Sequence, residues 1–492
     1  MTRRPCAGIP RVVLLLAGLL AAAGCSRAPR PSAVLITIDT LRADHLGCYG
    51  YAPPTSPHID ALARQGMVFR QARTTLPRTT QSIASILTGR LPKTHGARGL
   101  FAHLPEANLT LAEALRQAGY STAAVVSNTF LRRGQGFEQG FDSYDNPESR
   151  WDADSAGAVS DAAIAWLDRA PHDRPFFLWV HYLDPHWRYE PDPSWAGTFD
   201  PSFSEPFTVY QDLDAHRYTK GRMIFDPPLT PRQEQHVRAL YDGEIAQTDA
   251  AVGRLLDRLD RLDSRLVVVL TSDHGESLGE HGYHFAHGEY LYEQGLRVPL
   301  LVRFPGAVAA GSENDGMALN IDVAPTLLAL LGVSRLQGVE GRPLLVPAAG
   351  LPSAAGGASR APGFTAADGR PFSWAESDFQ LIHPENPRYF IRGPRGRWSS
   401  ACDGRYKLIH IPAPGREMLE LYDLRDDPGE SRNLVDDPAY EEVRRKLLHE
   451  VTRFADYGTG AGDVAAPKGG EAGPEALSPE EEERLRSLGY IN

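Results

Sequence analysis

Polar residues able to bind a metal or move a proton follow three short apolar segments of this sequence. They are Asp39-Thr40 after Ala33–Ile38, Asp184-Pro185-His186 after Phe176–His181, and Asp273-His274 after Leu266–Thr271. Short β-branched runs predict buried parallel strands, and such sheets collect ligand sites at the carboxyl ends of their strands. A single Asp in such a place is usually a helix cap or turn former. Several such polar residues on one sheet edge favour a shared ligand site.

The segment Ser272-Asp273-His274-Gly275-Glu276 is the strongest single signal. Adjacent Asp and His on a turn can give an oxygen and an imidazole to a divalent cation, and the Gly permits a sharp turn. A polar turn that caps a helix is the alternative. Three further histidines follow in the same loop, namely His281, His284 and His287, and loops rarely gather so many without a use.

A predicted helix between Pro77 and Gly89 has two threonines at its start, Thr79 and Thr80. The free backbone N–H groups and the positive dipole end there favour an anion, either a bound phosphate or sulfate or the developing alkoxide of a hydroxyl. A threonine in this place is more often only an N-cap. The segment alone therefore leaves both interpretations open.

The apolar segments alternate with helical patterns along most of the chain. Further strands are predicted at Thr122–Val126 and Val298–Phe304, and helices at Leu111–Ala118, Ser155–Leu167 and Glu234–Leu259. This alternation predicts an α/β fold with a mostly parallel sheet sandwiched by helices, over residues 33–345. The loop Asp192–Pro231, rich in Pro, Asp and aromatic residues, is expected over the cleft, where it would set specificity.

A second module is predicted after an Ala-, Gly-, Pro- and Ser-rich linker or loop at residues 346–370. It covers residues 371–456, with strands at Phe372–Trp374, Tyr389–Ile391, Trp398–Ala401, Tyr406–Ile411 and Met418–Tyr422, and a helix at Tyr440–Ala455. Residues 457–492 are predicted to be a tail with a short terminal helix.

Residues 1–25 are predicted to be an export signal, because Arg3 and Arg4 precede an apolar run that is too short to span a bilayer. The run ends at Cys25 and resembles a bacterial lipoprotein signal, which predicts a lipid anchor at Cys25 and a place in the cell envelope or periplasm. A plain cleaved signal is the alternative. The remaining Cys48 and Cys402 could form one bridge at most. A net charge of −11 without a basic cluster disfavours nucleic acid as a partner.

Blocks of residues resemble, in order and spacing, the characteristic blocks of the sulfatase family. They are Val34–Tyr51, Thr79–Gly96, Gly119–Thr122, Asp273–Gly282 and Leu291–Gly306, with Gly404–Leu408, Leu421–Leu424, Asp427-Pro428, Glu430 and Asn433 matching the carboxyl-terminal module. Such a set is far more specific than one motif. The resemblance implies the alkaline phosphatase-like fold with a smaller antiparallel second module.

By position, the resemblance makes Asp39, Asp273 and His274 metal ligands. The family's second amino-terminal carboxylate falls at Thr40, which therefore remains a metal-site position but argues against Ca²⁺, an ion that prefers about six to eight oxygens. One imidazole, two carboxylates and an alkoxide suit Zn²⁺ or Mn²⁺ better. The sulfatase resemblance itself implies Ca²⁺.

The nucleophile position departs from the family pattern. Sulfatases have Cys or Ser ten positions before the Gly of Leu-Thr-Gly, and that count gives Thr79 here, without the usual Pro and Arg after it. Threonine cannot become formylglycine, because its β-carbon carries a methyl group. It is the nucleophile in related branches, the nucleotide pyrophosphatase/phosphodiesterases and the phosphoethanolamine and lipoteichoic-type transferases. A metal that binds the Thr79 oxygen would lower its pKa for attack on phosphorus.

In the transferase branch two histidines contact the phosphoryl group, and by position these resemble His186 and His287. They could bind non-bridging oxygens, protonate the leaving group, or hold a second metal with Asp184. His95 and Arg78 are substrate-binding candidates for which a structural role fits equally well. The lysine and histidine that sulfatases place after the Gly-Tyr block fall on Ser127 and Thr129.

Three functions are consistent with these residues. The favoured one is a metal-dependent phosphoesterase or phosphotransferase with Thr79 as nucleophile, acting on a small-molecule, lipid-headgroup or glycan ester. The second is a sulfuric ester hydrolase that works without formylglycine. The third is an inactive binding protein of the envelope, against which the set of metal ligands facing a hydroxyl argues.

Overall fold

Continuous runs of apolar residues form the middle of a large sheet in this computed structural model. β1 (Ala33–Ile38) lies between β5 (Phe176–Tyr182) and β8 (Val267–Ser272), and every residue of the three strands is buried. Parallel strands covered on both faces need such sequences. Both pairings are parallel, with Ile38 opposite Tyr182 and Ser272, so the residues that follow the three strands meet at one edge.

The main sheet has eight strands in the order β12-β2-β11-β8-β1-β5-β3-β4. The outer strands are β2 (Met67–Arg73), β3 (Ser121–Val126), β4 (Ser143–Asp145), β11 (Leu300–Arg303) and β12 (Ser312–Leu319). β11 runs antiparallel to β2 and β8, whereas the other described pairings of this sheet are parallel. The predicted mostly parallel sheet is confirmed.

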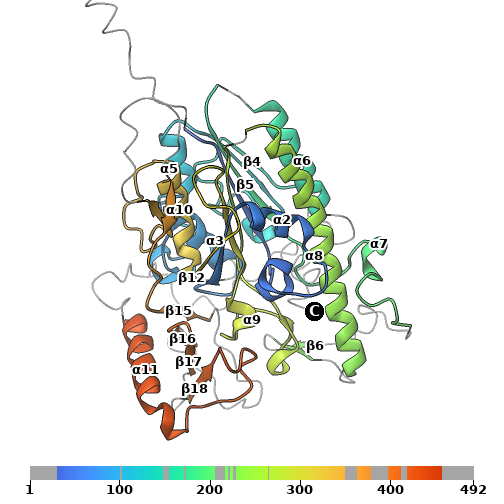
Figure 1. Cartoon of the computed structure of the whole chain (residues 1–492), viewed down its shortest axis with the longest axis vertical. Helices are drawn as coiled ribbons and strands as arrows, with labels where there is room; N and C mark the ends of the chain where they lie inside the picture. Colours follow the sequence, from blue (N-terminus) through green and yellow to red (C-terminus); the bar gives the residue numbers. More distant parts are fainter. Residues whose placement is uncertain are drawn as a thin grey trace, which may run out of the picture. The chain divides into compact units, whose positions relative to one another are not determined.

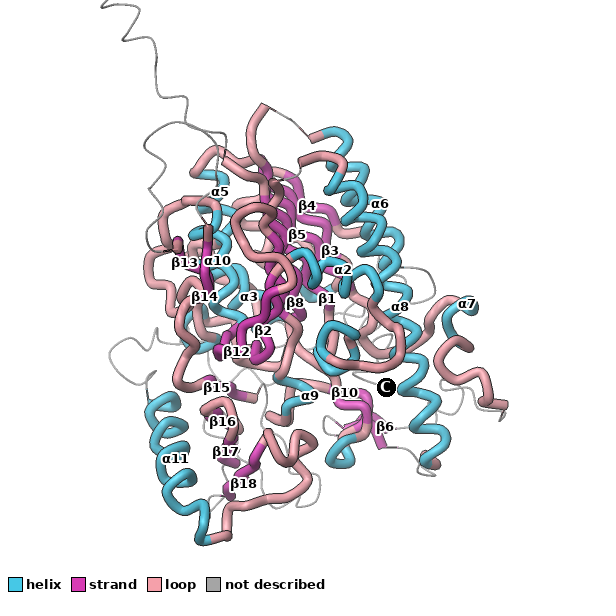
Figure 2. The backbone as a smooth tube through the Cα atoms, in the orientation of Figure 1, coloured by secondary structure: helices cyan, strands magenta, loops and turns pink. Residues whose placement is uncertain are grey.

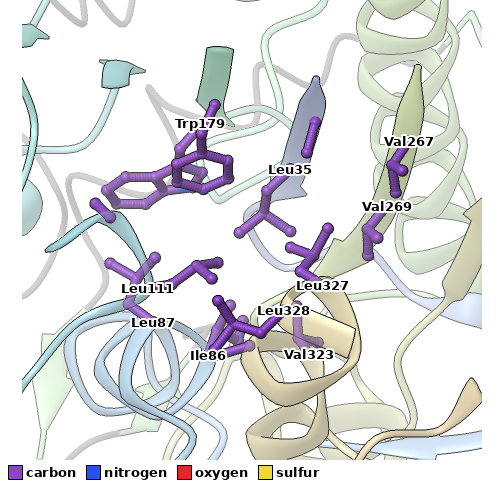
Figure 3. Packing of buried hydrophobic residues seen from close by; sticks show 14 of the residues in the cluster. Leu35, Ile86, Leu87, Leu111, Trp179, Val267, Val269, Val323, Leu327 and Leu328 are labelled. Atoms are coloured by element: carbon purple, nitrogen blue, oxygen red, sulfur yellow. The ribbon is translucent and has the colours of Figure 1, made fainter. Parts of the chain in front are cut away.

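Helices cover both faces of this sheet (Figure 1). One face packs against α3 (Thr79–Thr88), α5 (Leu111–Gln117) and α10 (Val323–Leu330), and the other against α2 (Pro57–Gln65), α6 (Ser155–Arg169) and α8 (Pro231–Asp260). Because side chains alternate along a strand, Leu35 joins the first core and Ile36 the second. Figure 3 shows Leu35 and Val269 on the sheet side of this core, beside Leu327 of α10.

A four-stranded antiparallel sheet follows in the second module, with α11 (Glu441–Asp456) beside it (Figure 2). Its strands are β15 (Ser373–Glu376), β16 (Ser399–Cys402), β17 (Tyr406–Ile411) and β18 (Met418–Asp423). The predicted antiparallel module is thereby confirmed, although the strand predicted at Tyr389–Ile391 lies outside the described residues.

The remaining elements are short. They are α4 (Pro92–His95), α7 (Pro193–Ala196), α9 (Glu293–Leu296), β6 (Arg217–Thr219), β7 (Arg222–Ile224), β9 (Ser277–Leu278), β10 (His284–Ala286), β13 (Leu345–Pro347) and β14 (Phe364–Ala366), besides several 3-10 turns. β13 pairs with β14, and Phe364 is buried in the first core. This end of the predicted 346–370 linker is therefore part of the core, because an aromatic side chain fills space beside β13.

The structure describes residues 30–99, 102–147, 155–170, 173–204, 217–219, 222–224, 229–263, 265–348, 363–377, 397–411 and 418–456. The predicted export signal, its Cys25 and the tail at 457–492 lie outside them. Cys48, half-buried, and Cys402, buried, are both free thiols. Among the described helices, even the 30-residue α8 is too polar to be a membrane span.

Candidate active site and metal centre

Three predicted ligands meet at the carboxyl edge of the main sheet. Asp39 directly follows β1, and Asp273 and His274 directly follow β8. One possible ligand atom from each residue lies within 4.8 Å of the others. His274 Nε2 is 3.4 Å from Asp273 Oδ2 and 3.7 Å from Asp39 Oδ1, and all three side chains are fully buried. The three residues form a candidate divalent-metal centre.

The hydrogen bonding of His274 fixes which ring nitrogen can bind a metal. Its Nδ1 lies 2.9 Å from the carbonyl oxygen of Gly275, which can only accept, so Nδ1 donates. Nε2 then carries the lone pair that faces the two carboxylates. Burial lowers the pKa of His274 to about 4 although Asp39 opposes the change, so the imidazole is neutral at pH 7.

The two carboxylates have opposite pKa shifts. Burial, and then the charge of Asp39, raise the pKa of Asp273 well above its ordinary value. Burial acts in the same direction on Asp39, but the imidazoles of His181, His186 and His274 outweigh it and bring that pKa to about 2. Asp39 Oδ1 and Asp273 Oδ2 are buried and lack a hydrogen-bond partner among the described residues. A divalent cation would neutralise both oxygens, so these residues fit such an ion.

The hydroxyl of Thr79 lies against this centre. Its Oγ1 is 3.3 Å from His274 Nε2 and 3.4 Å from Asp39 Oδ2. Thr79 is the first residue of α3, preceded by Arg78 in extended backbone without a side-chain cap. Ser82, one turn along, donates a 2.6 Å bond to the carbonyl oxygen of Asp273 and so ties the helix to the ligand turn. The predicted helix and its position at the site are both present.

Thr40 supports Asp273 through its backbone. The N–H of Thr40 donates to Asp273 Oδ1 at 3.2 Å, and its carbonyl oxygen accepts from the hydroxyl of Tyr241 at 2.8 Å. The φ of Thr40 is 53°, in the left-handed region that few non-glycine residues occupy. Its Oγ1 is buried without a hydrogen-bond partner in the described part of the chain. The role of Thr40 as a metal-site position stays a prediction.

His186 and His287 lie beside the candidate centre. The ring centroid of His287 is 4.3 Å from that of His274 and 5.1 Å from that of His186. His287 Nδ1 is 3.0 Å from Glu276 Oε1. His186 Nδ1 donates to the carbonyl oxygen of Trp187, so its Nε2 has the lone pair. The structure thus brings the two predicted histidines together next to the predicted ligands.

Arg78 is a buried cation held near the nucleophile position. Its Nη2 lies 2.9 Å from Glu289 Oε1 and 3.1 Å from the carbonyl oxygen of His287, and both members of the ion pair are 4% exposed. The guanidinium therefore has a structural partner and also adjoins the histidine of the candidate site. Both roles considered for Arg78 remain compatible with these contacts.

His95 has its contacts elsewhere. Its Nε2 is 3.1 Å from the hydroxyl of Ser85, and its Nδ1 accepts from the N–H of Ala97 at 3.1 Å. Burial lowers the pKa of His95 to about 3. Both ring nitrogens are used within the helix connection, so these contacts favour the structural role.

Asp184 and two of the loop histidines make structural contacts away from the candidate centre. Asp184 Oδ2 accepts from the hydroxyl of Ser155 at 2.6 Å and the N–H of Ala156 at 3.0 Å, which caps the start of α6. Asp184 is outside the candidate metal cluster of the described residues. His281 stacks on Tyr292, and His284 bonds Glu234, so only one of the three loop histidines reaches the site.

Sequence reasoning missed two residues that contact Asp39. Asn128 donates to Asp39 Oδ2 at 2.7 Å, and His181 Nε2 lies 3.6 Å from the same oxygen. His181 was contained in the predicted strand Phe176–His181, so its place at the strand end was the available signal. Asn128 stands between Ser127 and Thr129, the two positions to which the family pattern pointed.

The sulfatase family model matches residues 31–333, which contain all of these site residues. The chain belongs to the sulfatase family. A second model, for the C-terminal region of N-sulphoglucosamine sulphohydrolase, matches residues 397–456. The predicted family is confirmed, and with it an enzyme that hydrolyses sulfate or phosphate esters.

Proteins similar to this sulfatase-family enzyme are described as different kinds of hydrolase or superfamily member. An N-acetylglucosamine-6-O-sulfatase of Bacteroides thetaiotaomicron is 24% identical over 89% of each chain. A multifunctional alkaline phosphatase superfamily protein of Trinickia caryophylli is 26% identical, covering 86% of this chain and 94% of its own. The phosphonate monoester hydrolase of Agrobacterium radiobacter has the same fold, with a TM-score of 0.68 and 22% identity over 87% and 96% of the two chains.

Proposed function

We propose that this enzyme is a metal-dependent phosphoesterase or phosphotransferase that uses Thr79 as its nucleophile. The position of the Thr79 hydroxyl carries the proposal, because Oγ1 lies 3.3 Å from His274 Nε2 and 3.4 Å from Asp39 Oδ2 at the start of α3. A cation held by Asp39, Asp273 and His274, with Thr40 nearby, would supply Lewis acidity that lowers the pKa of a neighbouring hydroxyl. The donor set favours Zn²⁺ or Mn²⁺ over Ca²⁺.

The proposed reaction has two displacements at phosphorus. Oγ1 of Thr79 passes its proton to His186 or His287 and forms a bond to phosphorus, and the same imidazole gives that proton to the ester oxygen as this oxygen leaves. Water or an acceptor hydroxyl then attacks phosphorus and gives up its proton by the same route, the bond to Oγ1 breaks, and Oγ1 takes the proton back, which regenerates Thr79. Arg78 and the N–H groups at the start of α3 would contact phosphoryl oxygens.

Phosphate is favoured over sulfate by the nucleophile itself. Threonine has a methyl group on its β-carbon and cannot form the aldehyde that sulfatases use, whereas a threonine alkoxide serves phosphoryl transfer in related branches. The relatives named above include one sulfatase and an alkaline phosphatase superfamily protein described as multifunctional, so membership of the family is compatible with either ester. We propose a small-molecule, lipid-headgroup or glycan phosphoester as the substrate, met in the cell envelope by an enzyme anchored through Cys25.

The test is turnover of aryl phosphate monoesters, aryl phosphodiesters and aryl sulfates by the metal-loaded enzyme. Thr79→Ala and the neighbouring Thr80→Ala form a matched pair, because both residues lie in the first turn of α3 and are buried. We expect phosphoester turnover that Thr79→Ala abolishes and Thr80→Ala retains. Full turnover by Thr79→Ala would refute the nucleophile, and sulfate as the preferred ester would refute the substrate class.

A further inference from the structure

Glu276 is a buried carboxylate that contacts the imidazole of His287. Oε1 of Glu276 lies 3.0 Å from Nδ1 of His287, and the two side chains are 0% and 3% exposed. The short ribbon β9–β10 creates this contact, because Ser277 of β9 pairs with Ala286 of β10. Glu276 precedes the first strand and His287 follows the second, so the hairpin places the two residues side by side.

The rest of His287 is held from other directions. Its carbonyl oxygen accepts from Arg78 Nη2 at 3.1 Å and from the hydroxyl of Tyr283 at 3.0 Å. Its ring packs on His274 at 33° between planes and meets His186 edge-on at 73°. These contacts fix the backbone and the plane of the ring. Rotation of the ring about its bond to the β-carbon is fixed by the bond from Nδ1 to Glu276.

We propose that Glu276 is a positioning residue that sets the rotation of the His287 ring, so that Nε2 faces the phosphoryl group at Thr79. The inference rests on the function proposed above. A half-turn of the ring would exchange Nδ1 with a carbon and move Nε2 away from its place. The hydrogen bond prevents this whichever of its two atoms carries the hydrogen. A binding or catalytic imidazole needs such support, because small misplacements cost large factors in rate.

A purely structural role for Glu276, such as stabilising the β9–β10 ribbon, is the competing explanation. A double-mutant cycle separates the two, because a residue that acts through His287 has no further effect once the imidazole is absent. Glu276→Met removes the hydrogen bond and keeps the length of the side chain. Glu276→Asp keeps the carboxylate but withdraws it by one methylene, and it serves the same cycle where the Met variant fails to fold.

The experiment measures kcat on an aryl phosphate ester and the Kd for inorganic phosphate, each in the wild-type and His287→Ala backgrounds. We expect Glu276→Met to lower kcat about 10-fold or more and to weaken phosphate binding, with both effects nearly absent in His287→Ala. Glu244→Gln is the control, since Glu244 is a buried carboxylate that bonds the N–H of Glu190. The effects of Glu244→Gln on kcat and on the phosphate Kd should be equal in the wild-type and His287→Ala backgrounds.

Equal losses from Glu276→Met in both backgrounds would overturn the proposal. The phosphate Kd decides the question even where no ester is turned over, because it needs no reaction. Failure of the proposed function has a different signature, namely turnover that survives Thr79→Ala, and coupling between Glu276 and His287 can be measured in that case as well.

Discussion

The Thr79 hydroxyl and Nε2 of His274 lie 3.3 Å apart although the residues are 195 positions apart in the chain. Their contact depends on two elements, the amino end of α3 and the turn after β8, which Ser82 joins by its bond to the carbonyl oxygen of Asp273. A hydroxyl, a neutral imidazole and two buried carboxylates therefore share one small volume.

Asp273→Asn should separate metal binding from the stability of the metal-free fold. In the metal-free protein, Asp273 and Asp39 repel each other in a buried place, and burial raises the pKa of Asp273. We therefore expect Asp273→Asn to keep or raise the metal-free Tm and to abolish the Tm rise that Zn²⁺ or Mn²⁺ gives the wild type. A ligand at a thousandfold excess over its Kd stabilises by about 4 kcal/mol. Thermal unfolding with and without metal measures this, and an undiminished metal response would contradict it.

His95→Gln should reduce stability and leave substrate affinity unchanged. Both ring nitrogens of His95 are bonded to Ser85 and Ala97, and losing buried hydrogen bonds costs about 1–3 kcal/mol. Denaturant unfolding and KM measured on the same preparation check this. A raised KM with unchanged unfolding free energy would instead assign His95 to the substrate.

Lys407→Met should destabilise the contact between the second module and α9. Lys407 of β17 is 1% exposed and pairs with Glu293, at 3.2 Å, and with Glu430. Breaking a buried ion pair leaves an uncompensated carboxylate, at a cost of about 3–5 kcal/mol. Replacing Glu430 by Gln in the same chain should recover part of the loss. Urea unfolding of the single and double variants measures this. If Glu430→Gln recovers none of the unfolding free energy, the loss comes from packing and not from the unpaired carboxylate.

Glu280→Gln should change how stability depends on pH. Burial tends to raise the pKa of Glu280, but Arg42, 2.8 Å away, brings it to about 2 from 4.5. A lowered pKa in the folded state gives stability that is present above about 4.5 and is lost as pH falls toward 2. The wild type should therefore exceed the variant in unfolding free energy at pH 7, and the difference should shrink below pH 4.5. A difference that stays constant down to pH 3 would contradict this.

The meeting of the three candidate ligands was predictable, because Asp39, Asp273 and His274 follow apolar runs at the ends of the neighbouring parallel strands β1 and β8. The contact of His181 with Asp39 was not predictable, because a single polar residue at the end of an apolar run is read as part of the strand. The antiparallel direction of β11 was not predictable either, because a short apolar segment does not show which way its strand runs in the sheet. Glu276 meets His287 because β9 and β10 form a hairpin, and Lys407 meets Glu293 because the second module packs on α9. No local sequence pattern predicts either contact.

The most direct test of the central claim is to trap the phosphoryl group on the enzyme. Metal-loaded protein is mixed with an aryl phosphate ester, quenched in acid during turnover, and mapped by peptide mass spectrometry. We predict one phosphoryl group on Thr79, absent from Thr79→Ala and present in Thr80→Ala. A phosphoryl group on another residue, or turnover by Thr79→Ala at the wild-type rate, would contradict the role of Thr79.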